Sequence, residues 1–140
     1  MDYRAWALLS ALFAGLTAVL SKVGVAGVPS NLALAIRVSF VLAVTWLFAW
    51  ATKQTDFSSL NQKTVLWLGL SAVATGASWL CYFRALQMGP VSGVAPIDKL
   101  SFVVAMVLGV LVLKERVGAY TLAGSALIIT GVGLTLMQPK

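Results

Sequence analysis

The chain has 140 residues, of which 60% are hydrophobic and only 10% are charged, whereas a soluble domain carries charges at about 25% of its positions. So few charges cannot cover a surface that faces water, and the mean hydropathy is +0.95, so the composition excludes an ordinary soluble domain and indicates an integral membrane protein. The net charge of +6 does not indicate a nucleic-acid partner, because most bases stand singly between apolar runs and are better explained by orientation in the lipid bilayer.

Five apolar segments reach the length of about 20 residues that a crossing helix needs. The connections between them contain Gly and Pro at residues 24–31 and at residues 88–90, and the only long polar loop covers residues 51–63. No segment is typical of a strand. The sequence therefore predicts an all-α membrane protein whose residues 1–140 form a single transmembrane domain, with spans at residues 5–25, 32–50, 65–87, 91–113 and 120–137.

The distribution of positive charge predicts the orientation of the chain, because short loops rich in Lys and Arg stay in the cytoplasm. If the N-terminus is cytoplasmic, five bases lie on the cytoplasmic side and only one or two on the outer side. This bias predicts an N-in, C-out, multi-pass protein of the cell's inner membrane. The five bases are Arg4, Lys53, Lys63, Lys114 and Arg116.

Five charged residues fall inside the predicted spans, and in this orientation all of them come near the outer end of their helices. They are Lys22, Arg37, Arg84, Asp98 and Lys99. Neighbouring residues on a helix point about 100° apart, so Asp98 is expected to meet Arg84 or Arg37 of another span rather than Lys99, and Lys99 is expected to snorkel to the interface.

This charged layer has a structural and a functional interpretation. It is either an ion network that holds helices together, or the lining of a cavity for a solute. In the second case the excess of bases favours a solute with a carboxylate or phosphate, and Asp98, as the only acid at membrane depth, is the candidate for proton coupling.

Small and polar residues also recur at helical spacing in the later spans. One stripe contains Ser71, Thr75, Ser78 and Tyr82, and another contains Asp98, Ser101, Ala105 and Gly109. Such stripes indicate either tight helix packing or the wall of a polar cavity. Pro96 removes a backbone donor and is expected to loosen the fourth span beside Asp98. Gly124 and Gly131 share a face of the last span and favour packing or dimerisation.

Residues 82–117, YFRALQMGPVSGVAPIDKLSFVVAMVLGVLVLKERV, resemble the signature of the EamA family in the drug/metabolite transporter (DMT) superfamily. The similarity is to the small five-span bacterial and archaeal branch, and it covers essentially the whole chain. Its carrying features are the Arg-Ala-Leu at residues 84–86, the Ala-Pro-Ile at 95–97, the Lys-Leu-Ser at 99–101 and the Leu-Lys-Glu-Arg at 113–116. Arg37 also stands where such proteins usually carry an arginine.

The resemblance implies half of an inverted-repeat transporter. Full-length relatives have ten spans in two inverted repeats, so a lone five-span chain is expected to need a second copy, as a homodimer or as a heterodimer with another five-span chain. The strong charge bias agrees poorly with an inverted homodimer. This leaves a parallel homodimer, a partner of opposite orientation, or a chain that acts without forming the pathway of its ten-span relatives. Glu115 and Arg116 belong to the family pattern and are expected to have a structural role at the cytoplasmic interface.

The sequence thus favours a secondary transporter of small organic solutes, such as amino acids or metabolites. The alternative is a non-transporting membrane subunit that supports or regulates another complex. An enzyme is disfavoured, because there are no paired carboxylates, no nucleophile with a base and no histidine. No metal and no cofactor is expected, and Cys81, the one cysteine, is expected to be an inert buried thiol.

Overall fold

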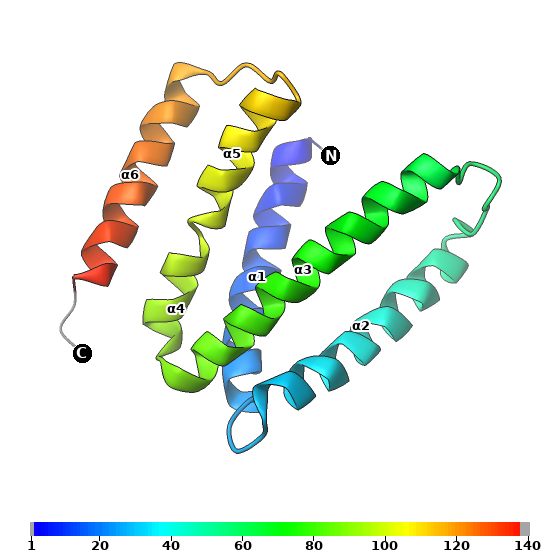
Figure 1. Ribbon diagram of the computed structural model, residues 1–140, viewed down its shortest axis with the longest axis horizontal. Helices are drawn as coiled ribbons and strands as arrows, with labels where there is room; N and C mark the ends of the chain where they lie inside the picture. Colours follow the sequence, from blue (N-terminus) through cyan, green and yellow to red (C-terminus); the bar gives the residue numbers. More distant parts are fainter. Residues whose placement is uncertain (1, 138–140) are drawn as a thin grey trace. The chain divides into compact units, whose positions relative to one another are not determined.

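The computed structural model describes residues 2–137, and these residues form six helices and no strand (Figure 1). Five segments are long and apolar enough to cross a membrane, with α4 and α5 counting together as the fourth. The predicted all-α, five-span fold class is therefore confirmed. The helices are α1 (Tyr3–Gly24), α2 (Ser30–Ala51), α3 (Gln62–Met88), α4 (Val91–Asp98), α5 (Ser101–Val112) and α6 (Ala119–Leu136).

The third span is longer than its apolar run. α3 begins at Gln62 rather than at residue 65, because the side-chain oxygen of Asn61 accepts the backbone N–H of Thr64 at 2.8 Å and its hydroxyl at 3.0 Å. The 27 residues of α3 cover about 40 Å, and the hydrocarbon layer is about 30 Å thick. α3 is therefore longer than the hydrocarbon layer is thick.

The chain divides into two compact units. The first contains α1 up to Val19 together with everything from Gly89 onward, and the second is Leu20–Met88. Most large apolar side chains of both units are exposed in the isolated chain. This is expected for helices whose surroundings are lipid, because lipid tails are as apolar as the side chains themselves.

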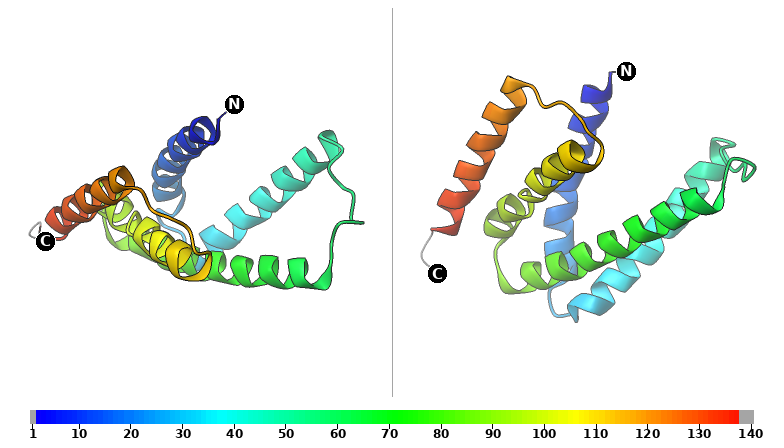
Figure 2. Two further views of the ribbon diagram at one scale, coloured as in Figure 1. Left: turned by 90° about the horizontal axis from the view of Figure 1, so that it is seen from above. Right: turned by 45° about the horizontal axis from the view of Figure 1, so that its top comes forward.

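In the second unit, α2 and α3 run antiparallel and pack against each other (Figure 1). Figure 2 shows the two helices diverging toward the loop that joins them. The loop is held by an aromatic cluster, in which the Trp46 ring centre lies 6.3 Å from that of Trp50 and 6.4 Å from that of Phe57. The Asp56 carboxylate accepts the backbone N–H of Ser58 at 2.9 Å and its hydroxyl at 2.8 Å, which lowers the pKa of Asp56 below its usual value.

In the first unit, α4 packs against α6. Ser125 and Val132 are buried and lie on one face of α6, and the Ser125 hydroxyl donates to the Thr121 carbonyl at 2.7 Å and lies 3.4 Å from the sulfur of Met106 on α5. A Cβ added to Gly124 or Gly131 would meet no atom within 4 Å. Among the described residues, nothing therefore fills the space beside these glycines, and their role in packing or dimerisation stays a prediction.

Cys81 differs from the prediction, because it is exposed on α3 rather than buried. The reason is that other parts of the chain cover little of the α3 surface, and only Phe83 and Leu86 of this helix are buried. An apolar segment in a soluble protein would turn such a residue inward, whereas a membrane span can leave it at the surface.

α2 ends in a Schellman motif with an unusual residue at its key position. The Gln54 N–H donates to the Ala49 carbonyl at 2.9 Å and the Lys53 N–H to the Trp50 carbonyl at 3.0 Å. Lys53 has φ 55°, in the left-handed region where glycine is usual. A lysine here keeps a positive charge at the negative end of the helix, at the cost of a strained backbone.

This strain can be measured with two variants that remove the same charge. The free energy of unfolding of Lys53→Gly should exceed that of Lys53→Val by about 1–2 kcal/mol, because only the valine variant must force a Cβ into the left-handed region. Chemical unfolding in detergent micelles measures both values. Equal stability of the two variants would show that residue 53 does not hold a positive φ.

Candidate functional site

The fourth span is interrupted in its middle. α4 ends at Asp98 and α5 begins at Ser101. In the turn between them, the Lys99 N–H donates to the Pro96 carbonyl at 3.1 Å and the Leu100 N–H to the Ile97 carbonyl at 3.0 Å. These bonds reach back three residues instead of four, which is the tighter 3₁₀ pattern that marks hinges within helices. The interruption lies where Pro96 was expected to loosen the span.

The predicted stripe of the fourth span crosses this interruption. Ser101, Ala105 and Gly109 lie at four-residue spacing on α5, whereas Asp98 is the last residue of α4. The linking residues Lys99 and Leu100 keep right-handed helical backbone angles. The Asp98-to-Gly109 stripe stays a prediction.

Asp98 and Lys99 also depart from expectation. The Lys99 ammonium lies 3.9 Å from the Asp98 carboxylate, so the two neighbours form an ion pair that helical geometry was expected to prevent. Lys99 keeps right-handed helical backbone angles (φ −67°, ψ −10°), so its long flexible side chain spans the separation. Both are partly exposed, so the pair is weak. Arg37 and Arg84 belong to the other compact unit, and their pairing with Asp98 stays a prediction.

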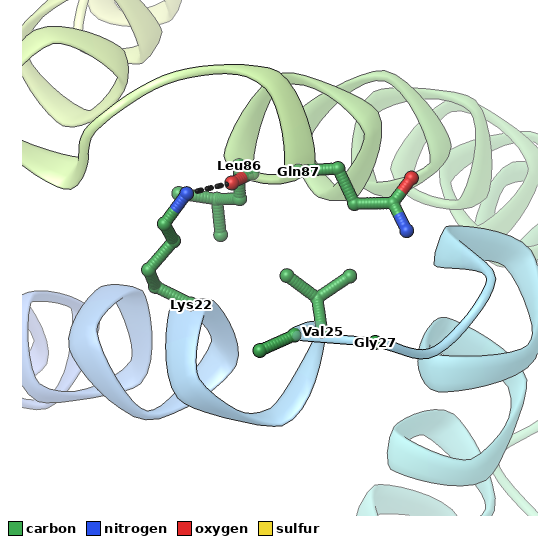
Figure 3. Close-up of a pocket in the computed structure, with 6 residues that line it drawn as sticks. Lys22, Val25, Gly27, Leu86 and Gln87 are labelled. Atoms are coloured by element: carbon green, nitrogen blue, oxygen red, sulfur yellow. Dashed lines mark hydrogen bonds between the residues drawn. The ribbon is translucent and has the colours of Figure 1, made fainter.

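In the second unit, polar side chains tie the end of α3 to the turn between α1 and α2. The Lys22 ammonium donates to the Leu86 carbonyl (Figure 3). Gln87 donates to the Val28 carbonyl at 2.7 Å and accepts a hydrogen bond from Arg84 at 3.1 Å. Leu86 lies in the last turn of α3, where carbonyls lack a helical partner and the helix end carries partial negative charge. The Lys22 ammonium supplies both a hydrogen-bond donor and a positive charge at this helix end.

These contacts surround a cavity of about 320 Å³. In Figure 3, Lys22 and Gln87 reach across it from opposite helices, with the apolar Val25 between them. Gly27 supplies the reversal of the chain with φ 73°, which a residue with a Cβ rarely adopts. The lining residues are Lys22, Val25, Ala26, Gly27, Leu86 and Gln87.

Arg37 lies about two turns inside α2 and faces aromatic rings of α3. Its guanidinium carbon lies 4.6 Å from the ring centre of Trp79 and 5.7 Å from that of Phe83. Trp79 and Phe83 are one helical turn apart, so they form one platform for the cation. Such cation–π contacts contribute about 0.5–2 kcal/mol, more as water is removed.

The polar stripe of α3 flanks this aromatic platform. Thr75 is exposed and donates its hydroxyl to the Ser71 carbonyl of its own helix at 2.9 Å, Ser78 is exposed, and Tyr82 is half-buried. Thus Arg37 and this stripe share one unit, whereas Asp98, Lys99 and Ser101 share the other.

Sequence reasoning missed the aromatic platform and Gln87. Trp79 and Phe83 stand four residues apart on the stripe-bearing helix, and an aromatic pair at that spacing was a visible signal. The sequence does not single out Gln87, because an amide side chain near a helix end is common and does not indicate a particular partner.

Glu115 and Gly109 meet at the end of α5. The Glu115 N–H donates to the Gly109 carbonyl at 3.1 Å, and a Cβ on Gly109 would lie 3.0 Å from a Glu115 carboxylate oxygen. The carboxylate therefore folds back over the glycine, while Arg116 follows in the exposed connection to α6. This arrangement is consistent with a structural role for Glu115. Among residues 2–137, no three His, Cys, Asp or Glu side chains gather as metal ligands.

Residues 4–137 match the family described as "EamA-like transporter family". The chain belongs to the EamA-like transporter family. The chain is 48% identical over 131 residues to an uncharacterized transporter in the cobO 3' region of a Sinorhizobium species, covering 93% of each chain. It is 31% identical over 85 residues to the "Probable 4-amino-4-deoxy-L-arabinose-phosphoundecaprenol flippase subunit ArnE" of Proteus mirabilis, covering 61% of this chain and 75% of that one.

No solved structure gives a significant match. The family match confirms the resemblance drawn from residues 82–117. Together with the five apolar helices, it makes this EamA protein a multi-pass protein of the inner membrane.

The contact between Lys22 and α3 predicts a loss of stability on substitution. Lys22→Met keeps the length of the side chain but leaves the Leu86 carbonyl without its cation, so the free energy of unfolding in detergent should fall by about 1.5–3 kcal/mol. Val23→Met at the exposed neighbouring position serves as the control and should change it little. If the two variants are equally stable, Lys22 does not cap α3.

Proposed function

We propose that this EamA protein is a half-transporter subunit that carries small organic solutes, such as amino acids or metabolites, across the inner membrane. The observation that carries the proposal is the interruption of the fourth span directly beside its only acid. Transporters of this general kind place discontinuous helices at their solute and coupling sites. The family match over residues 4–137 supports the same reading.

The interruption gives the fourth span two segments that can tilt separately. The Lys99 and Leu100 N–H groups bond back only three residues, and we propose that α4 changes its angle to α5 at this turn without unwinding either helix. Asp98 is the last residue of the moving segment. Protonation removes its charge and so lowers the cost of turning it away from a polar environment. We therefore propose that Asp98 couples proton binding to this movement, and that no covalent chemistry is involved.

The subunit is proposed to work as a dimer, with N-in and C-out orientation. Five spans place the two termini on opposite sides, so an inverted arrangement of two halves needs a second chain. The flippase relative is named as a subunit, which favours a heterodimer with another five-span chain over a homodimer. The same name also favours the second candidate function, a non-transporting subunit that supports another membrane complex.

Asp98→Asn tests the coupling role. In proteoliposomes, proton-gradient-driven uptake should fall to the level of empty vesicles, while counterflow of the same solute without a gradient should persist, because only the titrating group is lost. The screen starts from a mixture of amino acids and metabolites. Asp56→Asn, in the loop between α2 and α3, is the matched control and should keep driven uptake. Driven uptake by Asp98→Asn equal to that of the unmodified protein contradicts the role.

The dependence of flux on protein density tests the assembly. If two copies form the pathway, the rate per vesicle should rise with the square of the number of chains at low density, because two chains must meet. If a different chain is needed, flux should appear only after that chain is added. A rate strictly proportional to chain number down to one chain per vesicle would rule out the dimer, and absence of flux with every partner would favour the non-transporting alternative.

A further inference from the structure

Arg37 is a base within the spans whose N–H donors make no hydrogen bond to residues 2–137. A guanidinium has five N–H donors in a planar fork. Among residues 2–137, none of the hydrogen bonds or ion pairs of the structure engages the Arg37 side chain, although it is half-buried within a membrane span. Its contacts are with the flat faces of Trp79 and Phe83. These contacts place the cation over the two rings and use none of its N–H donors in a hydrogen bond.

The other bases at this end of the second unit are already engaged. Lys22 bonds to the Leu86 carbonyl, and Arg84 bonds to Gln87, which in turn bonds to the Val28 carbonyl. Both therefore hold the end of α3 to the α1–α2 turn. Arg37 stands apart from this network, so the two arginines that looked equivalent in the sequence have different surroundings.

The local charge favours an anion. Within Leu20–Met88 the only acid is Asp56, and it lies in the loop at the opposite ends of α2 and α3. The end that carries Lys22, Arg37 and Arg84 thus has three positive charges and no carboxylate from its own unit. In a region with little water, unmatched donors and charge cost several kcal/mol, so a group with acceptor oxygens would be bound favourably there.

We propose that the Arg37 guanidinium, held over the rings of Trp79 and Phe83, is a binding site for the oxyanion of a phosphate or carboxylate. Two N–H groups of the fork donate to two oxygens of the anion in a bidentate pair, and the cation–π contacts restrict where the guanidinium lies. The site deepens the proposed function, because it assigns an anionic class of solute to the transporter. Binding itself does not depend on transport.

The two sources of such a group are a soluble anion and a lipid headgroup, and binding measurements separate them. The full chain is placed in phosphatidylcholine nanodiscs and titrated with inorganic phosphate and with succinate by calorimetry. In parallel, the number of phosphatidic acid molecules retained by the chain is counted by native mass spectrometry. Binding of a soluble probe assigns the site to a solute, and retention of phosphatidic acid alone assigns it to a lipid.

Three variants test the role of Arg37. Arg37→Gln should weaken binding of the active probe about tenfold or more, because a charge-assisted pair is lost. Arg37→Lys keeps the charge and the fold but loses the planar fork, so it should also bind several-fold more weakly, which a purely electrostatic attraction would not produce. Lys63→Gln removes the same charge at the other end of α3 and should bind like the unmodified protein.

The proposal is overturned if none of the three probes binds the unmodified protein, or if Arg37→Lys and Arg37→Gln bind as it does. These results are independent of the transport assay. Anion binding without flux would contradict the proposed transport and support the anion site. Flux together with unchanged anion binding in the Arg37 variants would contradict the anion site and support the proposed transport.

Discussion

Hydrocarbon cannot solvate a charge, and this constraint explains how each ionised side chain within the spans is held. Lys22 bonds to a carbonyl that the end of α3 leaves open, Arg84 bonds to Gln87, and Arg37 lies on two aromatic rings. Asp98 pairs with its neighbour where the helix ends. In a soluble protein, water would solvate most of these charged side chains. Here the same requirement also fixes the α1–α2 turn against the end of α3, so the charged groups help to define the fold of the second unit.

The interruption of the fourth span has an energetic cost within the membrane. Breaking a helix inside the membrane removes regular hydrogen bonds, and the chain limits this cost by forming 3₁₀ bonds from Lys99 and Leu100 back to Pro96 and Ile97. The result is a 3₁₀ turn with an acid at its edge. Asp98 and the two arginines belong to separate compact units, so the proposed proton site and the proposed anion site draw on different parts of the chain.

The surface of the isolated chain suits a lipid environment. Most of its apolar side chains are exposed, and lipid tails cover such side chains as readily as protein does. A Cβ added to Gly124 or Gly131 of α6 would meet no atom within 4 Å among the described residues. Small residues at helical spacing allow another helix to approach closely, so this face of α6 is compatible with the proposed dimer.

The sequence by itself determined the class of the protein, the five spans and the family, because hydrocarbon tolerates only long apolar helices and the Pro96-to-Arg116 pattern is specific. It also identified the charged residues within the spans. Only the tertiary structure decided what each one does. Arg37 and Arg84 look alike along the chain, yet one lies over the ring of Trp79 and the other bonds to Gln87. Asp98 and Lys99 are neighbours that an ideal helix points about 100° apart, yet they form an ion pair where α4 ends. Periodicity describes a single unbroken helix, whereas partners and breaks depend on side chains that are distant in the sequence or on backbone bonds that a residue pattern does not specify.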